Sequence, residues 1–109
     1  MPNYSKNEVI LVQYPFSDLS ATKVRPAVVV NTPHPSQDNL IVPLTSRTTS
    51  LLSGEFVLID WQAAGLNVQT AVKRGIYTIY QSLVVKLVGR LTSQDAERLE
   101  QSLREWLGL

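Results

Sequence analysis

The sequence predicts a mostly β fold, a small barrel-like sheet of antiparallel strands followed by a C-terminal α-helix. The first two-thirds of the chain contains short apolar, β-branched runs separated by turn-forming residues, which is typical of small β domains. Residues 92–109 instead repeat apolar residues at helical spacing. A length of 109 residues suits a single domain, residues 1–109.

Seven extended segments are expected from apolar and β-branched runs. Pro43 within one run indicates an edge strand or a bulge, and Gly89 within another indicates a bulge or a close backbone approach. Residues 61–64 are expected to form one helical turn, which Gly65 ends. The expected strands are residues 9–14, 26–31, 40–45, 55–59, 68–73, 76–80 and 86–91.

A helix is expected to close the chain. Thr92 precedes it as an N-cap, and Asp95 places a carboxylate in the first turn, where the positive helix end favours it. Gly108 follows the last apolar residue as a stop signal. Four apolar residues at helical spacing form the stripe that we expect to be buried: Leu99, Leu103, Trp106 and Leu107.

The composition excludes several kinds of site. The chain contains no cysteine, which excludes a disulfide scaffold, a zinc–thiolate centre and thiol catalysis. Residues 1–6 lack the apolar segment of a signal peptide, and the longest apolar runs are too short to span a membrane. These features are compatible with a cytoplasmic protein that has no membrane partner.

Charges are unevenly distributed along the chain. Residues 92–109 hold four acidic and two basic residues, whereas the rest holds eight basic and five acidic ones, an excess of three positive charges. Residues 61–91 contain four basic residues and no acidic one. A basic body with a separate acidic element suits a polyanion or an acidic partner segment, although scattered, solvated charges explain so small an excess more simply.

No residue cluster predicts a metal site or a cofactor. The acidic residues are dispersed without metal-ligand spacing, and no Gly-rich phosphate loop is present. The one histidine, His34, lies between two prolines in a turn. A single histidine cannot supply a pair of imidazoles that act as general base and general acid, so His34 is interpreted as a surface residue.

Polar residues at two strand ends remain as candidates for chemistry. Pro26 favours an extended conformation of Arg25 at the start of the second strand. Thr45, Ser46 and Arg47 close the third strand. If these strands pair in antiparallel fashion, Arg25 and Thr45 lie at the same end of the sheet. A guanidinium fork and hydroxyls there would suit a phosphodiester, whereas a surface ion pair and a Thr–Ser turn are the simpler interpretation.

Several stretches of the chain resemble the MazF/PemK family of toxins. They occur in the family's order and span nearly the whole chain. The most specific feature is Arg25-Pro-Ala-Val-Val-Val30 combined with the later Val42-Pro-Leu-Thr-Ser46. The other stretches are residues 9–12, Pro15-Phe-Ser-Asp-Leu-Ser20, Asp60-Trp-Gln-Ala-Ala-Gly-Leu66 and Val88-Gly-Arg-Leu-Thr-Ser93. The chain departs from the family's Lys-Gly-Asp before the first strand, where it has Lys6-Asn-Glu8.

The resemblance implies a small SH3-like barrel of antiparallel strands with a C-terminal helix, assembled as a homodimer. It also implies the toxin of a type II toxin–antitoxin system, a sequence-specific endoribonuclease that cleaves single-stranded RNA, such as mRNA, without a metal. The implied partners are the RNA substrate, a cognate antitoxin protein and, through the antitoxin, operator DNA. The family's catalytic arginine falls on Arg25 and its catalytic hydroxyl falls on Thr45.

Further residues are implied to bind substrate. The loop after the first strand would line the RNA groove, and the end of the third strand would lie beside Thr45. The basic residue that this branch of the family has after the Ala-Gly-Leu stretch aligns with either Lys73 or Arg74. The implied substrate-binding residues are Phe16, Ser17, Asp18, Lys23, Ser46, Arg47, Lys73 and Arg74.

The implied reaction uses the ribose 2′-hydroxyl as nucleophile and leaves a 2′,3′-cyclic phosphate and a 5′-hydroxyl. Arg25 would stabilise the charge that develops on phosphate and assist proton transfer, although a guanidinium holds its protons strongly and is a poor base. Thr45 would orient the phosphate through a hydrogen bond.

Two other functions are compatible with the same resemblance. A CcdB-like gyrase poison shares this fold but binds a protein and cleaves nothing; its C-terminal Trp-Gly-Ile is similar to Trp106-Leu-Gly-Leu109. Packing of Trp106 in the helix stripe explains that residue equally well. A module without nuclease activity that retains only antitoxin and operator binding is the third possibility.

Overall fold

A computed structural model describes residues 4–15 and 22–109. Within them, the strands are β1 (Glu8–Pro15), β2 (Thr22–Val29), β3 (Asn39–Thr45), β4 (Phe56–Val57), β5 (Ala71–Val72), β6 (Tyr77–Ile79) and β7 (Val84–Arg90). A 3₁₀ turn, Gln81–Leu83, precedes β7, and helix α1 spans Ser93–Leu107. The strand order is β4-β5-β3-β2-β1-β7, and β6 pairs with the first half of β3.

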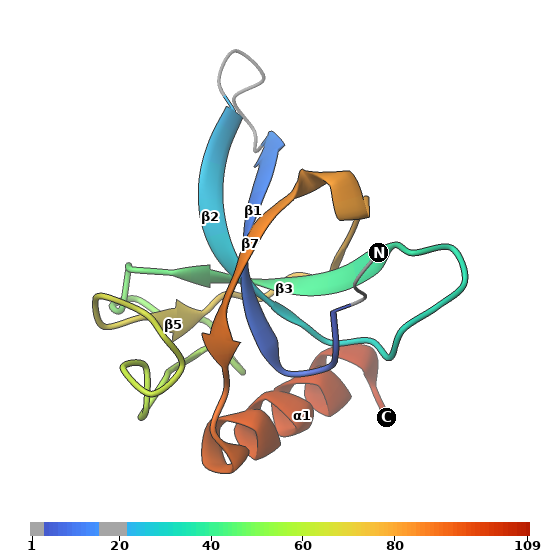
Figure 1. Cartoon of the computed structure of the whole chain (residues 1–109). Coiled ribbons are helices and arrows are strands. Elements are labelled where there is room, and N and C mark those ends of the chain that lie inside the picture. Colours follow the sequence, from blue (N-terminus) through green and yellow to red (C-terminus); the bar gives the residue numbers. More distant parts are fainter. Residues whose placement is uncertain (1–3, 16–21) are drawn as a thin grey trace.

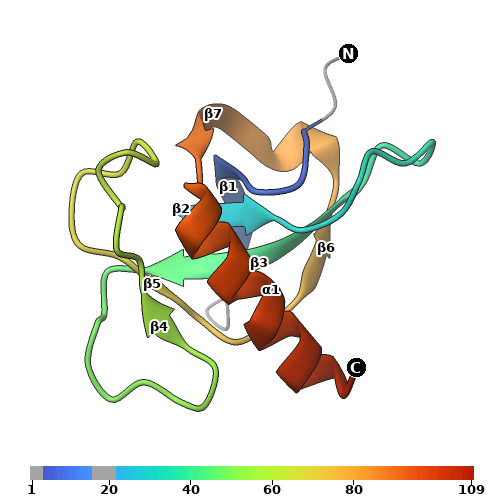
Figure 2. The same cartoon turned by 90° about the horizontal axis from the view of Figure 1, so that it is seen from below.

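The predicted fold class is confirmed as a mostly antiparallel β-sheet with a C-terminal helix. Every strand pairing is antiparallel, and the long strands curve strongly around one another (Figure 1). Among the described strands no pairing joins β4 to β7, so the barrel-like sheet is not closed. Helix α1 lies below the sheet in Figure 1 and crosses in front of β1, β2 and β3 in Figure 2.

Strand β1 is covered on both faces, which explains its continuous apolar run. Val9 belongs to the cluster on the helix side, together with Val28, Val42 and Leu99. The next residue, Ile10, belongs to a second cluster on the opposite face. Successive side chains of a strand point to opposite faces, so a run without polar residues is expected where both faces are buried.

Helix α1 begins and ends where the sequence predicts. Thr92 is the N-cap residue, and Gly108 has a left-handed backbone conformation with φ 71° at the C-cap. Leu99 is buried, whereas Leu103 and Trp106 are half-buried against the same core cluster. Leu107, the fourth member of the predicted stripe, is 56% exposed, so the buried face is narrower than expected. No helix in the described part of the chain is long and apolar enough to cross a membrane.

Several strands differ from the sequence prediction. β2 begins at Thr22 rather than at Pro26, because residues 22–26 extend the pairing with β1. β4 and β5 have two residues each, since the chain between them folds into a separate loop.

Pro43 does not mark an edge strand: β3 is central, and the Pro43 carbonyl accepts a hydrogen bond from the Lys73 N–H at 3.0 Å. The proline is tolerated because its missing N–H would face the break between β5 and β6.

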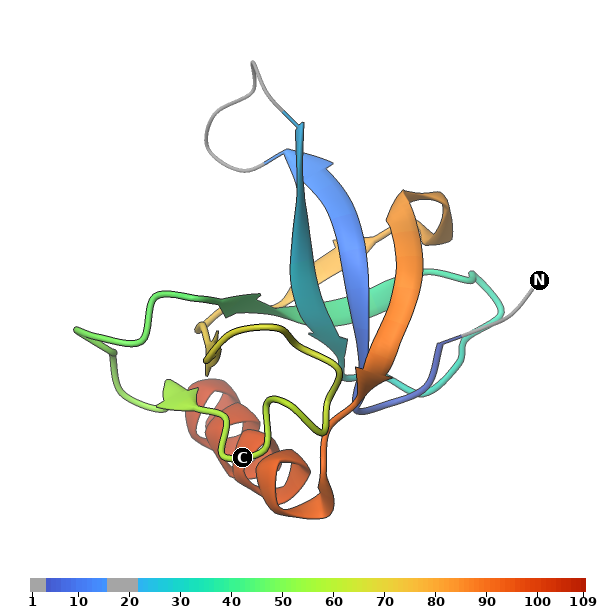
Figure 3. The same cartoon turned by 60° about the vertical axis from the view of Figure 1, so that its left-hand side comes forward.

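The loop of residues 58–70 is tied to the rest of the molecule. It passes between α1 and the end of β7 (Figure 3). The buried Asp95 side chain of α1 accepts hydrogen bonds from the N–H groups of Ile59 at 3.0 Å and Asp60 at 2.9 Å. The carboxylate lies in the first turn of α1, as predicted. It also binds these two N–H groups, because the loop brings them to that turn.

Gly89 on β7 is the second point at which this loop contacts the rest of the molecule. A Cβ atom at Gly89 would overlap the backbone carbonyl oxygen of Ala64, so the close approach predicted for this glycine is confirmed. The pairing of β7 with β1 also shifts in register between Gly89 and Leu87. Glycine is therefore needed where the loop crosses β7.

Candidate functional site

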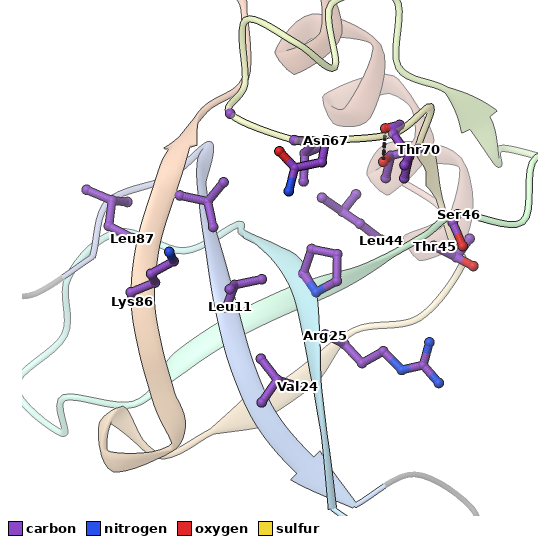
Figure 4. A pocket seen from close by; sticks show the side chains of 15 residues that line it. Leu11, Val24, Arg25, Leu44, Thr45, Ser46, Asn67, Thr70, Lys86 and Leu87 are labelled. Atoms are coloured by element: carbon purple, nitrogen blue, oxygen red, sulfur yellow. Dashed lines mark hydrogen bonds between the residues drawn. The ribbon is translucent and has the colours of Figure 1, made fainter.

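A cleft of about 450 Å³ extends the helix-side core toward solvent (Figure 4). Its floor contains Leu11 of β1, Pro26 of β2 and Leu44 of β3. Leu11 lies directly opposite Pro26 in the β1–β2 pairing, so both side chains share one face of the sheet. The floor is therefore apolar, and the polar groups of the cleft lie on its rims and on the covering loop.

Arg25 lies on the part of β2 that extends beyond its pairing with β3. That pairing includes only residues 27–29 of β2, so Arg25 lies beyond the residues that pair with β3. Arg25 is exposed and lines the cleft. In Figure 4 its guanidinium extends away from β2 on the side where Thr45 and Ser46 lie. The residue lies inside the strand rather than before it, which places its Cα firmly in the sheet.

Thr45 ends β3 on the same rim of the cleft. The Thr45 hydroxyl oxygen accepts a hydrogen bond from the Arg47 N–H at 3.1 Å, which is the turn that residue types alone indicate. A hydroxyl that accepts one hydrogen bond retains its proton for a bound ligand. Ser46 follows and also lines the cleft. The antiparallel pairing of β2 with β3 thus brings Arg25, Thr45 and Ser46 to one cleft.

Four other residues expected to bind substrate lie outside this cleft. Lys23, Arg47, Lys73 and Arg74 are exposed but do not line this cleft. The Arg74 N–H donates to the Glu55 carboxylate at 2.8 Å, beyond the end of β5. Phe16, Ser17 and Asp18 lie outside the described residues. A role for these residues in substrate binding stays a prediction.

Among the polar residues that sequence reasoning did not select, Lys86 and Asn67 also line the cleft. Lys86 lies on β7, directly opposite Leu11 of β1, and Asn67 lies on the covering loop. Lys86 was visible only as one of four basic residues between residues 61 and 91. Asn67 carries no sequence signal, because its place depends on how the loop folds back over the sheet.

In the described part of the chain, neither a metal site nor a histidine centre accompanies the cleft. No group of three or more His, Cys, Asp or Glu residues that could hold a metal occurs within residues 4–15 and 22–109. His34 lies in an exposed turn, where its Nδ1 is 2.8 Å from the Ser36 hydroxyl. The polar groups along the cleft are therefore a guanidinium, an ammonium, hydroxyls and an amide, which suit anionic phosphate and polar base edges.

Trp106 has a structural role at the far side of α1. Its indole N–H donates to the Ser53 carbonyl at 3.0 Å, and its ring packs against the core cluster. A Cβ atom at Gly54 would overlap the indole nitrogen, so this turn fits closely around the ring. Packing therefore explains the tryptophan, and a CcdB-like gyrase poison is not favoured.

Comparison with known proteins gives a family and a fold. The family model of PemK-like, MazF-like toxins of type II toxin–antitoxin systems matches residues 5–107. No curated protein matches the sequence. Three solved structures illustrate the similarity in fold.

The first is a mycobacterial endoribonuclease in complex with its cognate antitoxin, at 17% identity and a TM-score of 0.75, covering 97% of this chain and 96% of that chain. The second is the Mycobacterium tuberculosis toxin MazF-mt6, at 19% identity and a TM-score of 0.75, covering 94% and 97%. The third is a MazE–MazF complex from Deinococcus radiodurans, at 12% identity and a TM-score of 0.80, covering 100% and 99%. Because the family model matches nearly the whole length of this chain, the chain belongs to the PemK-like, MazF-like toxins of type II toxin–antitoxin systems.

Proposed function

We propose that this chain is a metal-independent, sequence-specific endoribonuclease that cleaves single-stranded RNA and thereby acts as a toxin. The observation that carries the proposal is the meeting of Arg25, Thr45 and Ser46 on one rim of the cleft, in a chain of this family. A mycobacterial protein with a similar fold is an endoribonuclease, which supports the same activity for this chain.

The proposed reaction is an attack of the ribose 2′-hydroxyl on the adjacent phosphorus. The 2′ oxygen loses its proton and bonds to phosphorus, while the 5′ oxygen leaves and takes up a proton. Negative charge accumulates on the phosphate oxygens during this step, and donors aimed at that charge usually contribute most to the rate. Arg25 would supply a planar pair of donors, and Thr45 would orient the phosphate with its hydroxyl proton.

We also propose one domain over residues 1–109, a homodimer, and inhibition by a cognate antitoxin in the cytoplasm, with operator DNA bound through the antitoxin. Complexes of similar folds with an antitoxin support this partner. An acidic, disordered antitoxin segment would bind along the cleft near Arg25 and Lys86 and order on binding.

Incubation of the purified protein with a long, structure-poor RNA in EDTA tests the proposal. We expect cleavage at defined sites, with a 2′,3′-cyclic phosphate on one product end and a 5′-hydroxyl on the other. The Arg25→Ala protein, purified identically, controls for contaminating ribonucleases. Intact RNA under these conditions, or cleavage that requires added magnesium or manganese, would contradict the proposed mechanism.

A further inference from the structure

The cleft continues beyond the Arg25–Thr45 rim into a second part with its own polar groups. Here the apolar floor around Leu11 and Pro26 lies between Lys86 on β7 and Asn67 on the covering loop. Figure 4 shows the Asn67 amide directed from the loop into the cleft, on the side facing Leu11. Within the described part of the chain, the Asn67 amide forms no hydrogen bond and the Lys86 ammonium forms no ion pair. Both groups are therefore available to a ligand.

The loop holds Asn67 in place through backbone contacts. The Leu58 N–H donates to the Thr70 carbonyl at 2.9 Å, which closes the loop at its base. The buried Thr70 hydroxyl donates to the Val68 carbonyl at 2.8 Å, and the Leu66 N–H donates to the Trp61 carbonyl at 3.1 Å. Asn67 thus lies between Leu66 and Val68, whose backbone groups are both hydrogen-bonded within the loop. A side chain held in this way can discriminate between ligands.

The chemistry of this part fits a nucleobase. A flat, apolar ring face can lie on the floor, as in most small-ligand clefts, while a few polar groups at the edge give specificity. A carboxamide offers one acceptor and two donors, and amide side chains recognise bases by pairing both with adjacent groups on the base edge. Lys86 would meet a neighbouring phosphate as a point charge.

We propose that this part of the cleft is a nucleobase subsite next to the cleaved phosphate, and that Asn67 determines which base it accepts. The inference rests on the proposed endoribonuclease activity and assigns part of its sequence specificity to one side chain. Arg25 and Thr45 act on the phosphate, which is identical at every nucleotide, so they cannot supply that specificity.

The test is the cleavage of a pool of RNAs with random sequence by wild-type protein and by Asn67→Asp, with the ends mapped by sequencing. Aspartate preserves the shape of asparagine but removes both N–H donors. The matched control is Gln69→Glu, which makes the same charge change on the same loop at an exposed residue outside the cleft. A second variant, Asn67→Leu, removes donor and acceptor together.

We expect Asn67→Asp to change the base preference at one position beside the cleaved bond by about fivefold or more, since one good base contact has that effect. Asn67→Leu should flatten the preference at the same position, and Gln69→Glu should preserve the wild-type pattern. An unchanged preference in both Asn67 variants overturns this inference, even if they bind the antitoxin more weakly. A wild-type protein that leaves the pool uncut overturns the proposed function, and this inference with it.

Discussion

The side chains that we propose to be functional owe their positions to the backbone rather than to core packing. Arg25 is exposed on a strand segment that β1 holds from one side, and Thr45 is held by the turn that its own hydroxyl forms. Neither side chain belongs to a core cluster. Substitutions at these residues should therefore separate chemistry from stability.

Arg25→Ala should lower the rate of RNA cleavage by about 100- to 1,000-fold, because it removes a donor aimed at the developing charge. Arg25→Lys should restore little, since a point charge does not reproduce the planar fork. Single-turnover cleavage rates measure both effects, and the urea midpoint checks the fold. Arg104→Ala, an equal loss of charge on the exposed face of α1, is the control. A near wild-type rate for Arg25→Ala would show that Arg25 is not catalytic.

Thr45→Ala should have a milder effect, a loss of about tenfold or less, because it removes one neutral hydrogen bond. Thr45→Ser retains the hydroxyl and should cleave at close to the wild-type rate. The same single-turnover assay compares the two variants. Equal losses in both would indicate that the Thr45 methyl group, rather than its hydroxyl, is what the site requires.

At the scale of elements, the loop of residues 58–70 connects the helix to the cleft. Asp95 on α1 binds its first N–H groups, Gly89 on β7 gives it room, and its far end covers the cleft. The Thr92 hydroxyl adds a further tie, since it donates to the Asp60 carboxylate at 2.9 Å instead of capping the helix. A substitution on α1 can therefore affect the cleft through this loop, without contacting a ligand bound there.

Asp95→Ala should lower the free energy of unfolding by about 3 kcal/mol, because it removes a buried charged acceptor of two hydrogen bonds. Asp95→Asn, which keeps one acceptor, should lose less. Urea unfolding measures the difference, and Glu97→Ala, at an exposed position of the same helix, provides the comparison. Should Asp95→Ala prove as stable as Glu97→Ala, the loop is not held through this carboxylate.

For the whole molecule, the open sheet leaves apolar side chains at its surface. β7 is an end strand and carries the exposed Val85 and Leu87, and Tyr80 before it is 69% exposed. Exposed apolar area of this kind commonly lies in contact with another protein. A second copy and an antitoxin are the partners that we propose for this chain.

Static light scattering should give twice the chain mass at micromolar concentration, because small proteins of this kind usually pair through a two-fold interface. Dilution should dissociate the dimer in a concentration-dependent way. A constant monomer mass across this range would rule out the proposed dimer.

The antitoxin should compete with RNA, because both are expected to bind along the cleft near Arg25 and Lys86. In a binding titration with the catalytically weakened Arg25→Lys protein, added antitoxin should displace labelled RNA and raise its apparent Kd. Simultaneous binding of both ligands at full affinity would argue that the antitoxin acts from another surface.

Local residue order was enough to predict much of this protein. The period and caps of α1 lie within a few residues of one another, so they predict its start and end correctly. The β-branched runs predict the long strands for the same reason. Arg25 and Thr45 were accessible as candidates because Arg25 precedes an expected strand, Thr45 ends another, and the surrounding stretches resemble a known family.

Tertiary structure alone decided the contacts between distant parts of the chain. Asp95 binds the N–H groups of residues 59 and 60 across some 35 positions in the sequence. Asn67 and Lys86 line one cleft, which exists only after the loop folds over the sheet. Pro43 lies in a central strand because β5 and β6 both pair with β3 along the edge opposite β2. Sequence patterns report which backbone conformation a segment prefers, whereas these contacts depend on which segments pack together, and that is set by the summed burial of the whole core.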